Sequence, residues 1–276
     1  MSYAGTVPGV LGATIRDSLQ LPERLQGAKR IDPWTDVLPG LVLFKVPGVA
    51  RYLVADGATI DVQPDADADR NSVELFLHGS ARGSLIHQRG ELALEAATVL
   101  SPVGAAIALS SYSAIGKSTV AAELCRRGWS LVADDITRVT WTGGRATAWP
   151  SHDALKLWRD ACARFGTDVE DLRRTRDGIE KFYVKMPFTS SPATLKAVIR
   201  LQLGSQARMM DVPAEHRAAL LSECTFRRRQ IAALKQQTAH EQMLRIVAGA
   251  SRVMVLNGAR DVPCEVLADH IVRAVS

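Results

Sequence analysis

The chain has 276 residues and lacks the features that mark several large protein classes. No apolar run approaches the roughly 18 residues of a membrane helix, since the longest is Pro102 to Leu109. The start of the chain has no basic stretch followed by an apolar core and a cleavage site. We therefore expect a cytoplasmic protein without a membrane partner. Aromatic residues make up only 5% of the chain, which argues against a base-stacking platform for nucleic acids.

Cysteine is also scarce, and its spacing argues against a disulfide framework or a zinc site. Cys125, Cys162, Cys224 and Cys264 lie far apart, with no CxxC pair and no histidine at zinc spacing. They are typical of buried thiols in a reducing compartment. The net charge of +5 suits a phosphate-bearing ligand but does not by itself indicate a nucleic acid, and we expect none as a partner.

Hydrophobic residues make up 47% of the chain, enough for a globular core in one large domain or two smaller ones. Residues 1–100 are predicted to form a mostly β N-terminal module. Short β-type runs bounded by turn residues support this, at Leu41–Val46, Arg51–Val54, Thr59–Val62, Ser72–Leu77 and Leu92–Leu94. The acidic segment Pro64–Asn71 is predicted to be a hairpin loop. A calcium site is the alternative there, although the glycine and terminal glutamate of a calcium loop are missing.

Residues 101–276 have an α/β pattern. An apolar run leads into a turn, a helical pattern over Lys117–Arg127 that ends at Gly128, and a strand at Ser130–Ala133. Further helices and strands are expected along the rest of the chain. The helices are Asp153–Phe165, Ala214–Cys224, Gln230–Ala248 and Cys264–Val275, and the strands are Leu195–Leu203 and Arg252–Leu256.

The turn before the Lys117 helix carries the most specific motif in the chain. Residues 111–118, SYSAIGKS, fit the phosphate-loop pattern G-x-x-x-x-G-K-[ST] except at Ser111, which replaces glycine. The motif predicts that Gly116 lets the backbone approach the phosphates, that Lys117 reaches the β- and γ-phosphates, and that the Ser118 hydroxyl holds Mg²⁺. The predicted nucleotide-binding residues are Ser111, Tyr112, Ser113, Ala114, Ile115, Gly116, Lys117, Ser118 and Thr119.

An ordinary strand-to-helix turn is the alternative for this segment. It would leave the Lys117 cation opposed to the helix dipole unless an anion lay there, and this favours a phosphate site. Replacing glycine by Ser111 costs free energy if the backbone there needs a positive φ.

Two carboxylates follow at the end of the next strand, in the run Leu131-Val132-Ala133-Asp134-Asp135. Strand alternation points the two side chains to opposite sides, so their functions can differ. One can hold Mg²⁺, and the other can accept the proton of an attacking hydroxyl. The alternative is that one of them caps the following segment.

The segments SAIGKST (Ser113–Thr119) and GWSLVADD (Gly128–Asp135) together resemble the HPr serine kinase/phosphorylase family. The segments Gln88–Leu100 and Tyr52–Ile60 are similar to those of a divergent branch of HPr-kinase-like enzymes. That branch includes kinases that phosphorylate the C-terminal serine of lasso-peptide precursors. The resemblance extends over about residues 40–260, with specific motifs only between about 88 and 138.

The resemblance implies an ATP- and Mg²⁺-dependent transferase. It implies that Lys117 holds phosphates, that Asp134 is the base on a substrate serine, and that Asp135 joins Ser118 at the metal or supports the substrate. The order of roles within the aspartate pair stays open. Ring-shaped assembly occurs in the family, so a homo-oligomer is a further expectation.

The family has a histidine before the phosphate loop, and Glu95 takes its place here. Glu95 is either a replacement acid/base or a strand residue, and the departure puts phosphorolysis in doubt more than kinase activity.

Basic residues further along the chain are candidates for neutralising the transferred phosphoryl group. The run Arg173–Lys185 is either a solvated face or a source of one such cation, Arg176 or Lys181. The resemblance favours Lys181 as the catalytic one. The Arg227–Arg229 run can bind phosphate or an acidic peptide, or only solvate a turn.

The predicted function is a serine kinase acting on a peptide or small protein, most of all a lasso-peptide precursor. The alternatives are a small-molecule or HPr-type kinase on the same scaffold and a non-catalytic nucleotide-binding regulator.

Overall fold

The structure, a computed structural model, describes residues 5–6, 10–112 and 115–275, with the backbone alone for residues 5, 6, 259 and 260. The chain forms two compact units. The first comprises Met1–Glu91, Arg174–Ile179 and Arg227–His240, and the second Leu92–Arg173, Glu180–Phe226 and Glu241–Ser276. None of the described helices is long and apolar enough to cross a membrane.

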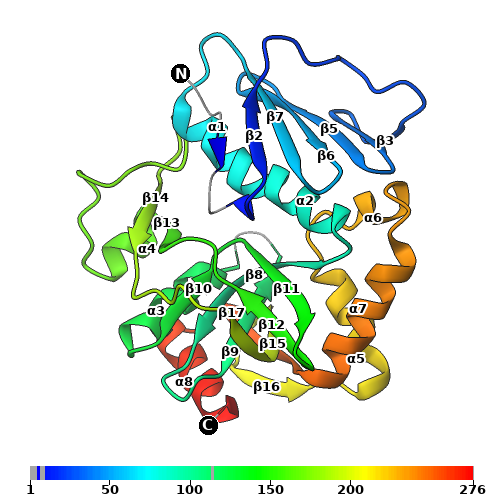
Figure 1. The fold of residues 1–276 in the computed structure, drawn as a ribbon. Helices are drawn as coiled ribbons and strands as arrows, with labels where there is room; N and C mark the ends of the chain where they lie inside the picture. Colours follow the sequence, from blue (N-terminus) through cyan, green and yellow to red (C-terminus); the bar gives the residue numbers. More distant parts are fainter. Residues whose placement is uncertain (1–4, 7–9, 113–114, 276) are drawn as a thin grey trace. The chain divides into compact units, whose positions relative to one another are not determined.

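The first unit contains a seven-stranded sheet in the order β1-β2-β7-β6-β5-β4-β3 (Figure 1). Its pairings are antiparallel except for β2 with β7. Phe44 and Tyr52 stack on adjacent strands with ring centroids 4.8 Å apart, and Tyr52 Oη donates to the carbonyl oxygen of Val73 at 2.9 Å. The strands are β1 (Gly5–Thr6), β2 (Thr14–Asp17), β3 (Lys29–Asp32), β4 (Thr35–Leu38), β5 (Leu41–Val46), β6 (Ala50–Ala55) and β7 (Thr59–Pro64).

Helical segments pack against this sheet. They are α1 (Arg70–Phe76), a π-helical turn over Leu77–Ala81, α2 (Arg82–Gln88) and α6 (Arg229–Ala233). The predicted strand at Ser72–Leu77 is therefore wrong, because Asp69 caps a helix by accepting from the Ser72 N–H at 3.0 Å. The predicted hairpin loop at Pro64–Asn71 is also wrong, since this segment joins strand β7 to helix α1.

The second unit contains an eight-stranded mixed sheet. Its main order is β10-β8-β11-β12-β15-β17-β16, and β9 pairs with both β15 and β8. The central pairings, β9 with β15 and β15 with β17, are parallel. The strands are β8 (Leu92–Leu100), β9 (Ala106–Ser111), β10 (Ser130–Ala133), β11 (Ile136–Thr142), β12 (Arg145–Trp149), β15 (Ala193–Gly204), β16 (Arg208–Asp211) and β17 (Arg252–Arg260).

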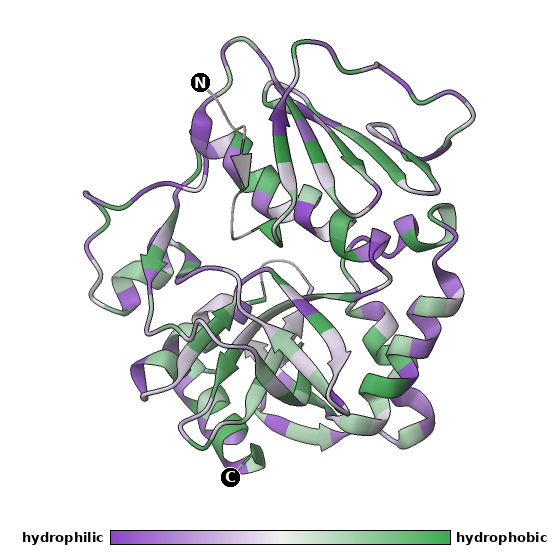
Figure 2. Cartoon of the chain, viewed as in Figure 1, coloured by the Kyte–Doolittle hydropathy of each residue, from purple (hydrophilic) through white to green (hydrophobic). Residues whose placement is uncertain are grey.

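Helices cover both faces of this sheet, which confirms a mixed α/β fold. Helices α3 (Lys117–Arg126) and α8 (Cys264–Val275) share a core with one face, and α5 (Ala214–Glu223) and α7 (Gln237–Ala250) with the other. In Figure 2 these helices alternate between hydrophobic and hydrophilic positions, as amphipathic helices do. Strand β8, which the sequence placed in the module of residues 1–100, belongs to this sheet.

Strands β13 (Ala154–Trp158) and β14 (Lys181–Lys185) form a separate two-stranded ribbon. Strand β13 leads directly into the short helix α4 (Arg159–Arg164), and β14 comes after that helix in the chain. The helix predicted over Asp153–Phe165 is therefore wrong in its first half, because Leu155 and Leu157 alternate onto the core as in a strand. The helix predicted over Gln230–Ala248 is two helices, α6 and α7, interrupted near Lys235, whose φ is 59°.

Candidate active site

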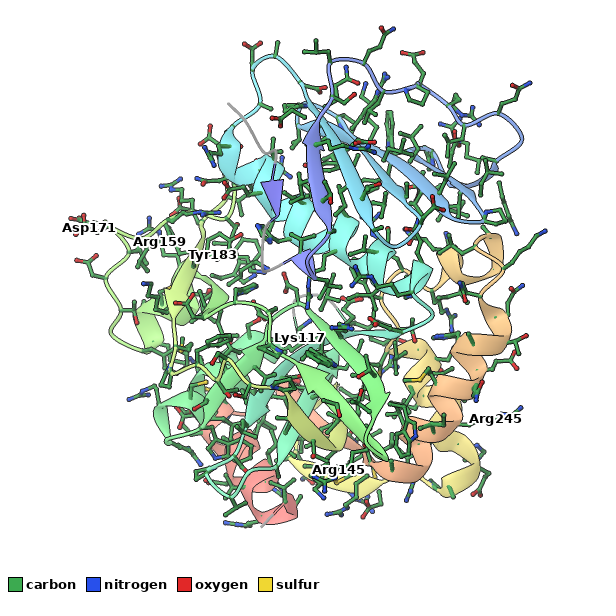
Figure 3. All side chains as sticks on the ribbon, viewed as in Figure 1. Lys117, Arg145, Arg159, Asp171, Tyr183 and Arg245 are labelled. Atoms are coloured by element: carbon green, nitrogen blue, oxygen red, sulfur yellow. The ribbon has the colours of Figure 1, made fainter. Side chains whose placement is uncertain are left out.

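Residues 111–118, which the sequence predicts to be a phosphate loop, run from the carboxyl end of β9 into the start of α3, in the predicted strand-to-helix setting. Gly116 is the N-cap residue of α3 and has a φ of 98°, which glycine adopts freely. The helix has no side-chain capping hydrogen bond at this residue. A helix start of this kind presents unpaired backbone N–H groups and suits an anion. Lys117, labelled in Figure 3, is the first residue of α3 and therefore lies at this anion-attracting end.

Ser111, the departure from the phosphate-loop pattern, fits its position without strain. It is not among the residues with positive φ in the described part of the chain, so the backbone there does not need glycine. Its hydroxyl donates to the carbonyl oxygen of Tyr112 at 2.8 Å. Ser113 and Ala114, also predicted to bind nucleotide, lie outside the described residues.

Asp134 is buried beneath the loop, with both carboxylate oxygens bonded. Only 2% of the surface of this residue is accessible to solvent. Oδ1 accepts from the Ser118 hydroxyl at 3.2 Å, and Oδ2 accepts from the backbone N–H of Lys156 at 2.9 Å. Asp134 therefore joins the first turn of α3 to ribbon strand β13.

Asp135 is held differently from its neighbour. It is the middle residue of a tight turn closed by the Ile136 N–H and the carbonyl oxygen of Asp134 at 2.7 Å, and its φ is 59°. A non-glycine residue held at positive φ is strained, and strain of this kind is common at functional sites. Its Oδ2 accepts from Lys156 Nζ at 2.6 Å.

Neighbouring charges determine the ionisation of Asp135 and Lys156. Burial alone would raise the pKa of Asp135, but Lys156, followed by Lys117 and Lys181, holds that pKa well below the usual range. Burial would lower the pKa of Lys156, but Asp135 and Asp134 raise it. The carboxylate and the ammonium are both charged at neutral pH.

A cavity of about 620 Å³ in the second unit brings most of the predicted site residues together. Its wall includes the loop, Asp135 and Lys181, whose Nζ lies 5.7 Å from the Trp158 ring centroid. Glu95 also lines it, from a position opposite Ile136 in the β8–β11 pairing. Among the predicted residues its lining comprises Glu95, Ser111, Tyr112, Ile115, Gly116, Lys117, Ser118, Thr119, Asp135 and Lys181.

Two groups of predicted basic residues belong to the other unit. Arg176 and the run Arg227–Arg229 fall in the first unit, where the Arg227 guanidinium lies 5.7 Å from the ring centroid of Phe44. Burial lowers the pKa of Arg227, which Asp32 partly offsets.

Lys156 was not among the site residues predicted from the sequence, although its side chain is only 8% exposed and its Nζ lies 2.6 Å from Asp135 Oδ2. The same holds for three other charged or aromatic residues of the cavity wall, Trp158, Asp160 and Arg164. The available signal was the alternation in Ala154-Leu155-Lys156-Leu157-Trp158, which indicates a strand with Lys156 and Trp158 on one face.

Comparisons with known proteins add a likeness to solved structures. No protein-family model matches the chain, and no curated protein matches it. Among solved structures the chain is similar to the Hpr(Ser) kinase/phosphatase from Coxiella burnetii, at 12% sequence identity and a TM-score of 0.33. The likeness covers 66% of this chain and 89% of that chain.

Proposed function

We propose that the chain is an ATP- and Mg²⁺-dependent kinase that transfers the γ-phosphoryl group to a serine hydroxyl of a peptide or small protein. One observation carries the proposal. The helix start at Gly116 and Lys117 and the carboxylate of Asp135 line the same cavity, so a phosphate site and a candidate base share one space. Phosphoryl transfer needs little beyond such positioning and charge stabilisation.

The residues around Ser118 fit Mg²⁺. The Ser118 hydroxyl and the Asp134 carboxylate are oxygen donors in direct contact, at 3.2 Å. Mg²⁺ prefers oxygen and is usually held by one or two carboxylates together with substrate phosphates. Among the described residues no three His, Cys, Asp or Glu side chains gather into a metal cage. When bound, the ion supplies positive charge against the phosphate oxygens.

Asp135 is the better candidate for the base, the reverse of the order that the sequence resemblance implies. Asp134 is buried with both oxygens bonded, whereas the Asp135 side chain is 38% exposed and lines the cavity. In the proposed step the serine Oγ forms a bond to the γ-phosphorus. The bond from that phosphorus to the bridging oxygen breaks, ADP leaves, and the hydroxyl proton passes to Asp135.

Cations around the reacting group complete the proposed site. Lys117 faces the phosphates from the helix start, Lys156 holds Asp135, and Lys181 lies on the opposite ribbon strand. Charge on the transferred group would be stabilised by Lys117 and Lys181, since electrostatic stabilisation is usually the largest catalytic contribution.

The C-terminal serine of a lasso-peptide precursor is the acceptor we propose to test first. Its support is the sequence similarity of Gln88–Leu100 and Tyr52–Ile60 to that branch of HPr-kinase-like enzymes.

The test incubates the full chain with labelled ATP and Mg²⁺ and with peptides encoded by neighbouring reading frames. Lys117→Ala should abolish transfer, whereas Lys196→Ala, an exposed lysine on β15, should not change it. Asp135→Asn should lower kcat by about 100-fold or more with little change in ATP affinity. Full transfer by Asp135→Asn would overturn the base assignment, and absence of ATP binding by the wild type would overturn the function.

A further inference from the structure

A buried arginine lies next to the phosphate loop, outside the cavity already described. Arg200, on strand β15, is 3% exposed and pairs in register with Ser110 of β9, directly before the loop. One guanidinium nitrogen, Nη1, donates to Glu223 Oε2 of helix α5 at 2.7 Å. Its Nε is buried and has no hydrogen-bond partner among the described residues. The Glu223 contact therefore leaves part of this buried cation unsatisfied.

The Cys224 thiol also interacts with this guanidinium, and the loop supplies a further contact. Tyr112, the second residue of the phosphate loop, is 63% exposed, yet its ring centroid lies 4.3 Å from the Arg200 guanidinium carbon. An aromatic face at this distance attracts a cation electrostatically, most strongly where the cation is shielded from water.

The two ends of the loop are held on opposite faces of the sheet. Arg200 follows the alternation of β15 onto the face of Val198, whose core includes residues of α5. Helix α3, which the loop enters, packs on the other face with Ile199 and Leu201. Tyr112 thus contacts Arg200 on one face of the sheet, and Gly116 leads into α3 on the other.

We propose that Arg200 is a positioning residue of the phosphate loop, acting through the ring of Tyr112. Together they hold the start of the loop, Ser111 and Tyr112, at the place where the phosphate-loop pattern has glycine and this chain has Ser111. The inference rests on the proposed nucleotide site and deepens it. A loop fixed before the nucleotide arrives loses less conformational freedom on binding, so the contact contributes to affinity for the phosphates without touching them.

The decisive variants change the ring at an exposed position, where folding is not at risk. Tyr112→Leu removes the aromatic face, and Tyr112→Phe keeps the face and removes only the hydroxyl. Trp141→Leu is the matched control, because Trp141 is 45% exposed on β11 of the same unit and lies away from the loop in sequence and sheet register.

The experiment measures the Kd of Mg²⁺-ATP by calorimetry, KM and kcat in the kinase assay, and the melting temperature. Tyr112→Leu should raise Kd and KM by about 3- to 10-fold, with kcat within about twofold and the melting temperature lowered by only a few degrees. Trp141→Leu should bind as the wild type does, and Tyr112→Phe, which keeps the aromatic face, should lose less affinity than Tyr112→Leu. In an Arg200→Gln background, Tyr112→Leu should have no further effect on Kd, because the partner is already absent.

An unchanged Kd in Tyr112→Leu overturns the inference, and so does an equal loss in Tyr112→Phe. If Arg200→Gln does not fold, the two Tyr112 variants still decide the question. Loss of binding in Lys117→Ala together with an unchanged Kd in Tyr112→Leu would reject the positioning role alone. Absence of ATP binding by the wild type would reject the proposed function as well.

Discussion

The ion pair between Lys156 and Asp135 can be broken by Lys156→Met without disturbing the rest of ribbon strand β13. Methionine keeps the length of the side chain, and the backbone N–H of residue 156 still donates to Asp134. The neighbouring Leu155 and Leu157 remain in the core. The variant therefore removes one ammonium group that lies 2.6 Å from the Asp135 carboxylate and leaves that carboxylate in the cavity wall.

The size of the effect follows from the burial of the two partners. Removing one partner of a fully buried pair costs about 3–5 kcal/mol, and an exposed pair contributes about 0–1 kcal/mol. Lys156 is 8% exposed but Asp135 is 38% exposed, so the carboxylate regains water when the ammonium is lost. We therefore expect Lys156→Met to lower the free energy of unfolding by about 2 kcal/mol, between those limits.

Urea unfolding of the wild type, Lys156→Met, Asp135→Asn and the double variant measures this coupling directly. The double variant should be more stable than the sum of the single changes predicts, by about 1–2 kcal/mol. Additivity within about 0.5 kcal/mol would refute the pairing as a source of stability.

The pH dependence of the free energy of unfolding tests whether the ionised Asp135 stabilises the folded state. The folded-state pKa of Asp135 is lowered, so its stabilisation is complete at neutral pH and is lost as the pH falls below the ordinary Asp value of about 4. The stability gap between the wild type and Lys156→Met should narrow in that range.

Two further substitutions and one alkylation experiment test other parts of the account. Gly116→Ala forces an L-residue into a φ of 98°, and calorimetry should show ATP binding weakened by about 10-fold or more. Asp69→Ala removes the cap of α1 and should lower the free energy of unfolding by about 1 kcal/mol, measured in urea, whereas no change would reject the cap. Burial raises the pKa of the Cys125 thiol to about 12, so alkylation at pH 8 followed by mass spectrometry should leave it unmodified until denaturant is added.

Local patterns in the sequence were enough to predict the helix that follows residues 111–116 and several other elements. The helix beginning at Lys117, the strand Ser130–Ala133 and the helix Cys264–Val275 have the expected bounds within a residue, because their periodicity is strong and, for the first of them, Gly128 marks the end. The strand Leu41–Val46 is also confirmed. In each of these segments the local preference and the tertiary environment favour the same structure.

The errors arose where a short apolar pattern fits both helix and strand. The apolar pattern of Ser72–Leu77 predicts a strand, although Asp69 stands three residues before Ser72, at capping distance. The pattern of Asp153–Phe165 predicts one helix, whereas its first half is the strand that carries Lys156. The contact between Lys156 and Asp135 joins residues 21 positions apart on different elements, so no local pattern could reveal it.

Burial also distinguishes Asp134 from Asp135, two residues that the local sequence pattern does not tell apart. Asp134 and Asp135 are adjacent carboxylates, and alternation predicts only that they face different sides. Their partners, Ser118 and the Lys156 backbone for one and the Lys156 ammonium for the other, depend on how β10, α3 and β13 meet in three dimensions.

Calorimetric titration of Mg²⁺-ATP into the wild type and Lys117→Ala tests the central claim, a nucleotide-phosphate site at the start of α3, most directly. We predict saturable binding at one site in the wild type and an affinity about 10- to 100-fold lower in Lys117→Ala, as expected for losing one charge-assisted contact to phosphate. Absence of binding by the folded wild type, or equal affinity in the two proteins, would contradict the account.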